Sequence, residues 1–154
     1  ICEAVATDLG DQLPDNSHAL PNWTQLARAG ESRLRAAKLG YRARYINQTA
    51  IYLAEHSNTL QQIETAPTEE ARALLMELPG VGRKIADCTL LFGMGRLEAF
   101  PIDTWVQKIL TQAYGLEGWK TDQLLDFARA HFGPSAGLAQ QYLFAAARAG
   151  RILC

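Results

Sequence analysis

The sequence is poor in cysteine, has no long apolar run and carries no large excess of either charge. The three cysteines, Cys2, Cys88 and Cys154, have neither paired nor metal-type spacing, which favours a reduced intracellular protein over a secreted one. Three cysteines are also too few for a four-cysteine iron–sulfur cluster within the chain. The apolar runs are far shorter than the roughly 20 residues that cross a membrane, and no basic-then-apolar leader opens the chain. We therefore expect no membrane association and an intracellular location, which is the cytoplasm or nucleoid if the source is bacterial.

The charged residues are unevenly distributed along the chain. A net charge of −1 lacks the basic excess typical of nucleic-acid-binding proteins. Between positions 28 and 44, however, six basic residues accompany one acid, Glu31, whereas glutamates dominate the next third of the sequence. Two interpretations stay open: a basic face that contacts phosphates, or helix faces that are merely solvated.

The hydrophobic pattern predicts an all-α protein. Apolar residues recur at three- and four-residue spacing in the stretches 45–53, 71–78, 85–92, 106–113, 124–132 and 138–147. Pro, Gly, Asp and Asn mark the connections at 11–22, 93–101, 115–118 and 133–134. With no repeat or linker, 154 residues are enough for one helical unit with a buried core over residues 1–154.

The run from Leu78 to Lys84 lies between a predicted helix at 68–77 and a second at about 83–92. Glycine permits the positive φ of a tight turn, so both Gly80 and Gly82 are expected to shape the hairpin. The amides of Val81 to Arg83 then begin the second helix, where free N–H groups and the helix dipole favour an anion such as a DNA phosphate. An ordinary helix-to-helix turn has the same pattern, so this motif alone leaves both interpretations open.

Four segments together resemble one enzyme family. The sequences GVGRKIADC (residues 80–88) and FPIDTWV (100–106) resemble the helix-hairpin-helix DNA glycosylases with a Gly/Pro-rich loop and an aspartate. LGYRARY (39–45) and FGPSAGLAQQYLF (132–144) are similar to the 8-oxoguanine DNA glycosylase/lyase branch. Trp105 stands where animal members have histidine, which favours a bacterial-type member.

The resemblance implies an all-α glycosylase core with its helix-hairpin-helix at about 68–92. The family's N-terminal β-domain has no counterpart here, and Ile1 falls inside a predicted amphipathic helix. We therefore expect the chain to be the C-terminal portion of a larger enzyme, a monomer, and a poor enzyme on its own. The implied partner is double-stranded DNA containing oxidised guanine, with no cofactor required.

Removal of a base needs a nucleophile and a group that stabilises positive charge on the sugar. The resemblance assigns these roles to Lys84 and Asp103. A Schiff base formed by the lysine also explains strand cleavage. Burial and the neighbouring Arg83 are expected to favour the neutral amine of Lys84. Without the resemblance, Lys84 is better explained as a phosphate contact and Asp103 as a helix N-cap.

The resemblance also assigns residues that read the DNA. Cys88, Gln140 and Phe144 match positions against the extruded purine, although a core cysteine and an ordinary amphipathic helix are the alternatives. Tyr41 and Arg42 match the residues that fill the vacated gap and bond the opposite cytosine. Tyr45 is expected in the core. The remaining DNA-binding residues are those of the hairpin, namely Gly80, Val81, Gly82 and Arg83.

Related hairpins hold a cation through backbone carbonyls, which correspond here to Met76, Leu78 and Val81. The sequence neither supports nor opposes this cation, and the scattered histidines predict no side-chain metal site. Two other functions stay open: a glycosylase for another damaged base, or a non-catalytic helix-hairpin-helix DNA-binding module.

Overall fold

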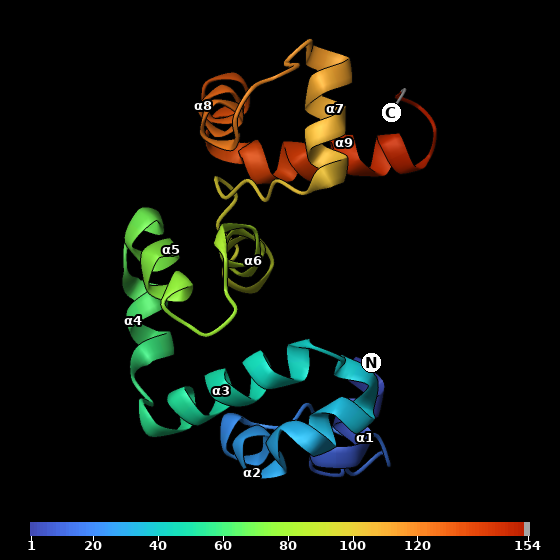
Figure 1. Cartoon of the computed structure of the whole chain (residues 1–154), viewed down its shortest axis with the longest axis vertical. Helices are drawn as coiled ribbons and strands as arrows, with labels where there is room; N and C mark the ends of the chain where they lie inside the picture. The colour runs from blue at the N-terminus through green and yellow to red at the C-terminus, as the bar shows by residue number, and fades with distance from the viewer. Residues whose placement is uncertain (153–154) are drawn as a thin grey trace. The chain divides into compact units, whose positions relative to one another are not determined.

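The computed structural model describes residues 1–152, which contain helices and no β-strand apart from one isolated bridge between Gln12 and His18 (Figure 1). The predicted all-α fold class is confirmed. Cys154 lies outside the described residues. The chain forms two compact units: one contains residues 1–65 and 76–80, and the other contains residues 66–75 and the chain from 81 onward. The extent of the domain predicted over 1–154 stays a prediction.

The first unit is built around two neighbouring helices, α2 (Trp23–Leu34) and α3 (Arg42–Glu55), which lie side by side in Figure 1. Asn22 caps α2, because its side chain accepts the N–H of Gln25 while the Gln25 side chain accepts the N–H of Asn22. The unit also contains α1 (Cys2–Leu9), the short wide-turn segment η1 (Arg35–Leu39) and α4 (Thr59–Thr65). Its core consists of Val5, Leu26, Leu34, Ala37, Leu39, Ala43 and Ala50.

The second unit places three helices around a separate apolar core. These are α7 (Thr104–Tyr114), α8 (Thr121–Phe132) and α9 (Ala136–Arg148), with a single turn η3 (Gly133–Ser135) leading into α9. The predicted stretches 106–113, 124–132 and 138–147 fall inside these helices. The core consists of Phe100, Val106, Leu110, Leu116, Leu124, Leu125, Ala128 and Ala136.

The hairpin joins α5 (Thr68–Met76) to α6 (Arg83–Cys88), and the chain continues as the wider turn η2 (Thr89–Gly93). Gly80 has φ +76°, and a side chain there would collide with the ring of Tyr45. Gly82 differs from the expectation, because its φ of −92° is extended backbone that any residue can adopt. It serves instead as the N-cap of α6, with open space where a Cβ would lie.

A close backbone contact fixes α9 against the chain that precedes α7. Gly137 donates its N–H to the carbonyl oxygen of Leu97 at 2.7 Å. A Cβ at this position would collide with the carbonyl oxygen of Ala99 and lie 2.6 Å from Leu91 Cδ1. Glycine is therefore required here for close approach rather than for a turn.

Candidate active site

The continuous helical stretch of α6 and η2 carries three side chains that line one pocket. Lys84 lies in the first turn and Cys88 one turn later, and Phe92 follows after four more residues in η2. Residues four apart on a helix point in the same direction. All three line the same pocket, so the predicted shared face of Lys84 and Cys88 is confirmed.

Asp103 is fixed by its place at the start of α7. Its Oδ1 accepts the backbone N–H of Val106 at 2.8 Å, and its backbone is extended, as an N-cap requires. The predicted capping role is therefore confirmed. The side chain is half-buried and also lines the pocket that contains Lys84.

The last helix supplies the remaining wall of the pocket. Gln140 and Phe144 lie one turn apart on α9, and both face the pocket. Gln140 is 5% exposed, whereas Phe144 is half-buried, with the guanidinium of Arg148 5.9 Å from its ring centre. A buried amide beside an accessible ring provides both the hydrogen bonds and the stacking surface that a flipped base needs.

These elements together form a pocket of about 190 Å³ within the second unit. The structure brings together all five residues that the sequence assigned to catalysis and base binding: Lys84, Cys88, Asp103, Gln140 and Phe144. Lys84 belongs to α6 and Asp103 precedes α7, and both side chains line this one pocket. Placement of these two residues on opposite surfaces would have removed the case for an enzyme.

The pocket opens to solvent on the side of Lys84. Lys84 is exposed, so the expectation that burial surrounds its amine is wrong. Cys88 lies deeper, and burial raises the pKa of its thiol more than the charge of Lys84 lowers it. Cys88 therefore lines the pocket as a neutral thiol rather than a thiolate.

Sequence reasoning missed three residues that line this pocket: Phe92, Pro101 and Gln141. The four-residue spacing from Lys84 through Cys88 could have identified Phe92, whose side chain is 62% exposed. No pattern distinguishes Gln141 from other polar residues on α9. In the structure its Nε2 donates a hydrogen bond to Gln140 Oε1.

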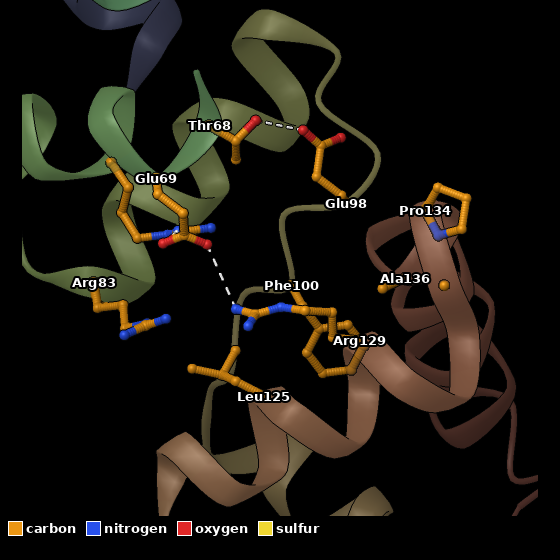
Figure 2. A pocket seen from close by; sticks show the side chains of 11 residues that line it. Thr68, Glu69, Arg83, Glu98, Phe100, Leu125, Arg129, Pro134 and Ala136 are labelled. Atoms are coloured by element: carbon orange, nitrogen blue, oxygen red, sulfur yellow. Dashed lines mark hydrogen bonds and ion pairs between the residues drawn. The ribbon is translucent and has the colours of Figure 1, made fainter. Parts of the chain in front are cut away.

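A second pocket of about 300 Å³ is lined by residues of α5, α6 and α8 in the same unit (Figure 2).

A buried ion pair joins two helices of this unit. Arg72 donates from Nε to Asp87 Oδ1 at 2.6 Å and also pairs with Glu69. The Arg72 and Asp87 side chains are only 8% and 2% exposed. Burial raises the pKa of the Asp87 carboxyl, while the hydrogen bond from Arg72 acts in the opposite direction. This pair joins α5 to α6, in agreement with the prediction that Asp87 orients neighbouring helices.

The residues expected to contact the opposite strand lie in the first unit. Tyr41 is 68% exposed at the start of α3, and the Arg42 guanidinium lies 5.1 Å from its ring centre. Tyr45 was expected in the core but is 41% exposed, although its ring packs against Gly80. Two of the six clustered basic residues are already paired: Arg33 with Asp8 and Arg35 with Glu31.

The hairpin residues Gly80 and Gly82 are exposed, and Val81 and Arg83 are half-buried. Met76 and Leu78 belong to the first unit and Val81 to the second, and the cation predicted at their carbonyls stays a prediction.

Within residues 1–152, no group of three or more His, Cys, Asp or Glu side chains is placed to hold a metal ion. None of the helices in this part of the chain has both the length and the apolar character needed to cross a membrane.

Comparison with known proteins places this chain in a family. Residues 1–134 match the sequence profile of the HhH-GPD superfamily of base excision DNA repair proteins. The chain belongs to this superfamily. A probable N-glycosylase/DNA lyase from Methanothermobacter thermautotrophicus is 40% identical over 120 residues, which cover 78% of this chain and 38% of that protein. The N-glycosylase/DNA lyase OGG1 of Arabidopsis thaliana is 36% identical over 154 residues, and this alignment covers 93% of this chain and 42% of the Arabidopsis protein.

The fold of this HhH-GPD chain is also similar to solved structures. The 8-oxoguanine glycosylase/lyase of Clostridium acetobutylicum, solved with double-stranded DNA containing cytosine opposite 8-oxoguanine, superposes with a TM-score of 0.90 at 31% identity. The match covers 98% of this chain and 53% of that enzyme. The chain therefore spans about half or less of the length of these relatives.

Proposed function

We propose that this chain forms the catalytic core of a DNA glycosylase that excises 8-oxoguanine from double-stranded DNA and then cleaves the abasic site. The observation that carries this proposal is that Lys84 and Asp103 line one pocket together with an amide and an aromatic ring. A non-catalytic DNA-binding module needs the hairpin but has no use for this arrangement.

In this proposal Lys84 is the nucleophile. After it loses a proton, its Nζ forms a bond to C1′ of the damaged nucleotide as the bond from C1′ to the base breaks. The base leaves with the electron pair and takes up a proton. The sugar ring then opens to a Schiff base, and loss of a proton from C2′ expels the 3′ phosphate. This last step is the lyase reaction.

Asp103 is proposed to stabilise the positive charge that develops on the sugar and to accept the proton that Lys84 releases. Its hydrogen bond to Val106 fixes the carboxylate before substrate arrives. Such preorganisation matters because a group that must move during the reaction loses part of its effect.

Base recognition is proposed to rest on Gln140, Phe144 and Cys88, which line the pocket. The hairpin from Gly80 to Arg83 is proposed to hold a backbone phosphate, and Tyr41 and Arg42 to contact the opposite strand. We further propose that the enzyme acts as an intracellular monomer without a cofactor, and that the hairpin carbonyls of Met76, Leu78 and Val81 hold a cation.

Borohydride trapping tests the central assignment. The native protein, with whatever residues flank this chain in it, is incubated with a duplex containing one 8-oxoguanine and reduced. We expect a covalent protein–DNA adduct, because reduction fixes the Schiff base. Lys84→Gln should abolish both the adduct and the strand nick, whereas Lys108→Gln, which removes another exposed lysine outside this pocket, should keep them.

The same variants separate a nucleophile from a phosphate contact. If Lys84 instead contacts a phosphate, its removal would weaken binding on any sequence and reduce the steepness of log affinity against log salt by about 0.9. We expect Lys84→Gln to leave both quantities near those of the native protein. An adduct formed by Lys84→Gln at the native rate would place the nucleophile elsewhere.

A further inference from the structure

Two glutamine side chains meet inside the pocket, and only one of them has a role so far. Gln140 is 5% exposed, and its neighbour Gln141 is half-buried; both line the pocket. Gln141 Nε2 donates a hydrogen bond to Gln140 Oε1. The donor and acceptor atoms of the two amides are therefore arranged in a fixed order.

This order matters because a primary amide is nearly symmetric in shape but not in chemistry. Its oxygen accepts and its NH2 group donates, and rotation of the amide by half a turn exchanges the two. A guanine-type edge presents an acceptor at position 6 beside a donor at position 1, whereas an adenine-type edge presents the reverse. A glutamine that is free to rotate can therefore pair with either edge.

Gln141 removes this freedom. Its N–H group occupies one of the two lone pairs of Gln140 Oε1 and leaves the second lone pair for a base. Rotation of the Gln140 amide would bring two NH2 groups together and break the hydrogen bond. Because Gln140 is almost fully buried, a lost hydrogen bond there is not replaced by bulk water.

We propose that Gln141 is a positioning residue that fixes the Gln140 amide in one orientation and thereby restricts the pocket to a guanine-type edge. The inference rests on the proposed function, in which Gln140 reads an extruded 8-oxoguanine. In that arrangement Gln140 Oε1 accepts the N–H at position 1 of the base while Nε2 donates to the oxygen at position 6. In this proposal Gln141 acts through its hydrogen bond to Gln140.

Two substitutions test the role of the donor. Gln141→Met keeps the length of the side chain but neither donates nor accepts. Gln141→Glu accepts only, so it favours the rotated Gln140 amide, which presents the order complementary to an adenine-type edge. The matched control is Gln112→Glu, which introduces the same charge at an exposed glutamine on α7 outside this pocket.

The measurement is the single-turnover excision rate of the native protein and its variants on duplexes that contain either 8-oxoguanine or 8-oxoadenine. The readout is the excision rate on 8-oxoguanine divided by the excision rate on 8-oxoadenine. Nicking of a preformed abasic site, which has no base to read, is measured in parallel. We expect Gln141→Met to lower the ratio by roughly tenfold, within the range that one good base-edge pair contributes. Gln141→Glu should lower it further by raising the rate on 8-oxoadenine, and Gln112→Glu should keep the native ratio.

Each other result overturns the inference. An unchanged ratio in both Gln141 variants would mean that Gln140 is oriented by something else. Equal losses on both lesions and on the abasic site would mean that Gln141 only supports the fold of α9. A native protein that excises neither lesion would instead overturn the proposed function, and this outcome is visible before any variant is made.

Discussion

Asp103 Oδ1 accepts the backbone N–H of Val106 at 2.8 Å, and this one hydrogen bond both begins α7 and aims a carboxylate at the pocket of Lys84. A structural role and a chemical role thus share a single side chain. The two roles depend on different properties of it, because capping needs an oxygen acceptor whereas charge stabilisation needs a negative charge.

Asp103→Asn should therefore separate the two roles. Asparagine is as good an N-cap as aspartate, so the free energy of unfolding should stay near that of the native protein. Excision should slow by roughly 100-fold or more, in the range expected for loss of a general acid–base group. Single-turnover excision assays measure the rate, and urea titrations measure the free energy of unfolding.

Asp103→Ala is the matched comparison, because it removes both the charge and the cap. It should slow excision as much as Asp103→Asn does. It should also lower the free energy of unfolding by about 0.5–2 kcal/mol. Native-like excision by Asp103→Asn would show that the carboxylate serves only as a cap.

Phe144→Ala tests the stacking surface. We expect binding to lesion-containing DNA to weaken by roughly 1–3 kcal/mol, the usual contribution of a stacked base. Binding to an abasic site should weaken less, because that site has no base to stack. Fluorescence anisotropy on both duplexes gives the comparison, and equal losses on the two would assign Phe144 to the core.

Arg72→Met tests the buried pair that joins α5 to α6. The substitution removes the 2.6 Å hydrogen bond to the buried Asp87 and leaves it only the looser contact with Arg83 Nε at 4.0 Å, so we expect a loss of about 3–5 kcal/mol of unfolding free energy at neutral pH. Arg35→Met is the control, because the Arg35–Glu31 pair is exposed and its loss should cost less than about 1 kcal/mol. Comparable losses in the two variants would contradict the buried pair's importance.

The deficit of Arg72→Met should also depend on pH. Burial raises the pKa of Asp87 above its ordinary value of 3.8, and removal of Arg72 takes away the largest opposing influence. An acid whose pKa is raised on folding favours the folded state while it is protonated and loses that contribution as pH rises through the raised pKa. Urea titrations should therefore show the deficit shrinking as pH falls from 7 toward 3.8.

Arg42→Ala tests recognition of the opposite strand. If Arg42 bonds the unpaired cytosine, the substitution should reduce the preference for cytosine over other opposite bases by roughly 1–3 kcal/mol. Arg44→Ala removes an exposed arginine two residues further along α3 and should keep the preference. Excision rates on duplexes that differ only in the opposite base decide the matter, and an equal loss on all of them would identify Arg42 as a phosphate contact.

Much of the second unit could be predicted from the sequence because its signals are local. The three- and four-residue apolar spacing located α7, α8 and α9, and the Asp103–Thr104 step gave the start of α7. Lys84, Cys88, Gln140 and Phe144 were identified through similarity and helical spacing, and the structure adds that they share one pocket with Asp103.

The errors arose where tertiary packing decides. The sequence around Gly82 is typical of a turn glycine, yet its backbone is extended and it caps the start of α6. Tyr45 has an aromatic ring at core spacing and packs against Gly80, yet it is 41% exposed. The exposure of Lys84 and the hydrogen bond between Gln140 and Gln141 depend on which elements surround the pocket, and a linear pattern carries no such information.

The contact at Gly137 has a consequence for changing the substrate preference. Because α9 touches the chain before α7 backbone to backbone, the helix that carries Gln140 and Phe144 has no room to slide relative to the segment that leads to Asp103. If α9 reads the base as proposed, new base preferences should then arise through exchange of its side chains rather than through movement of the helix. A directed library should therefore vary positions 140, 141 and 144 together and keep position 137 as glycine.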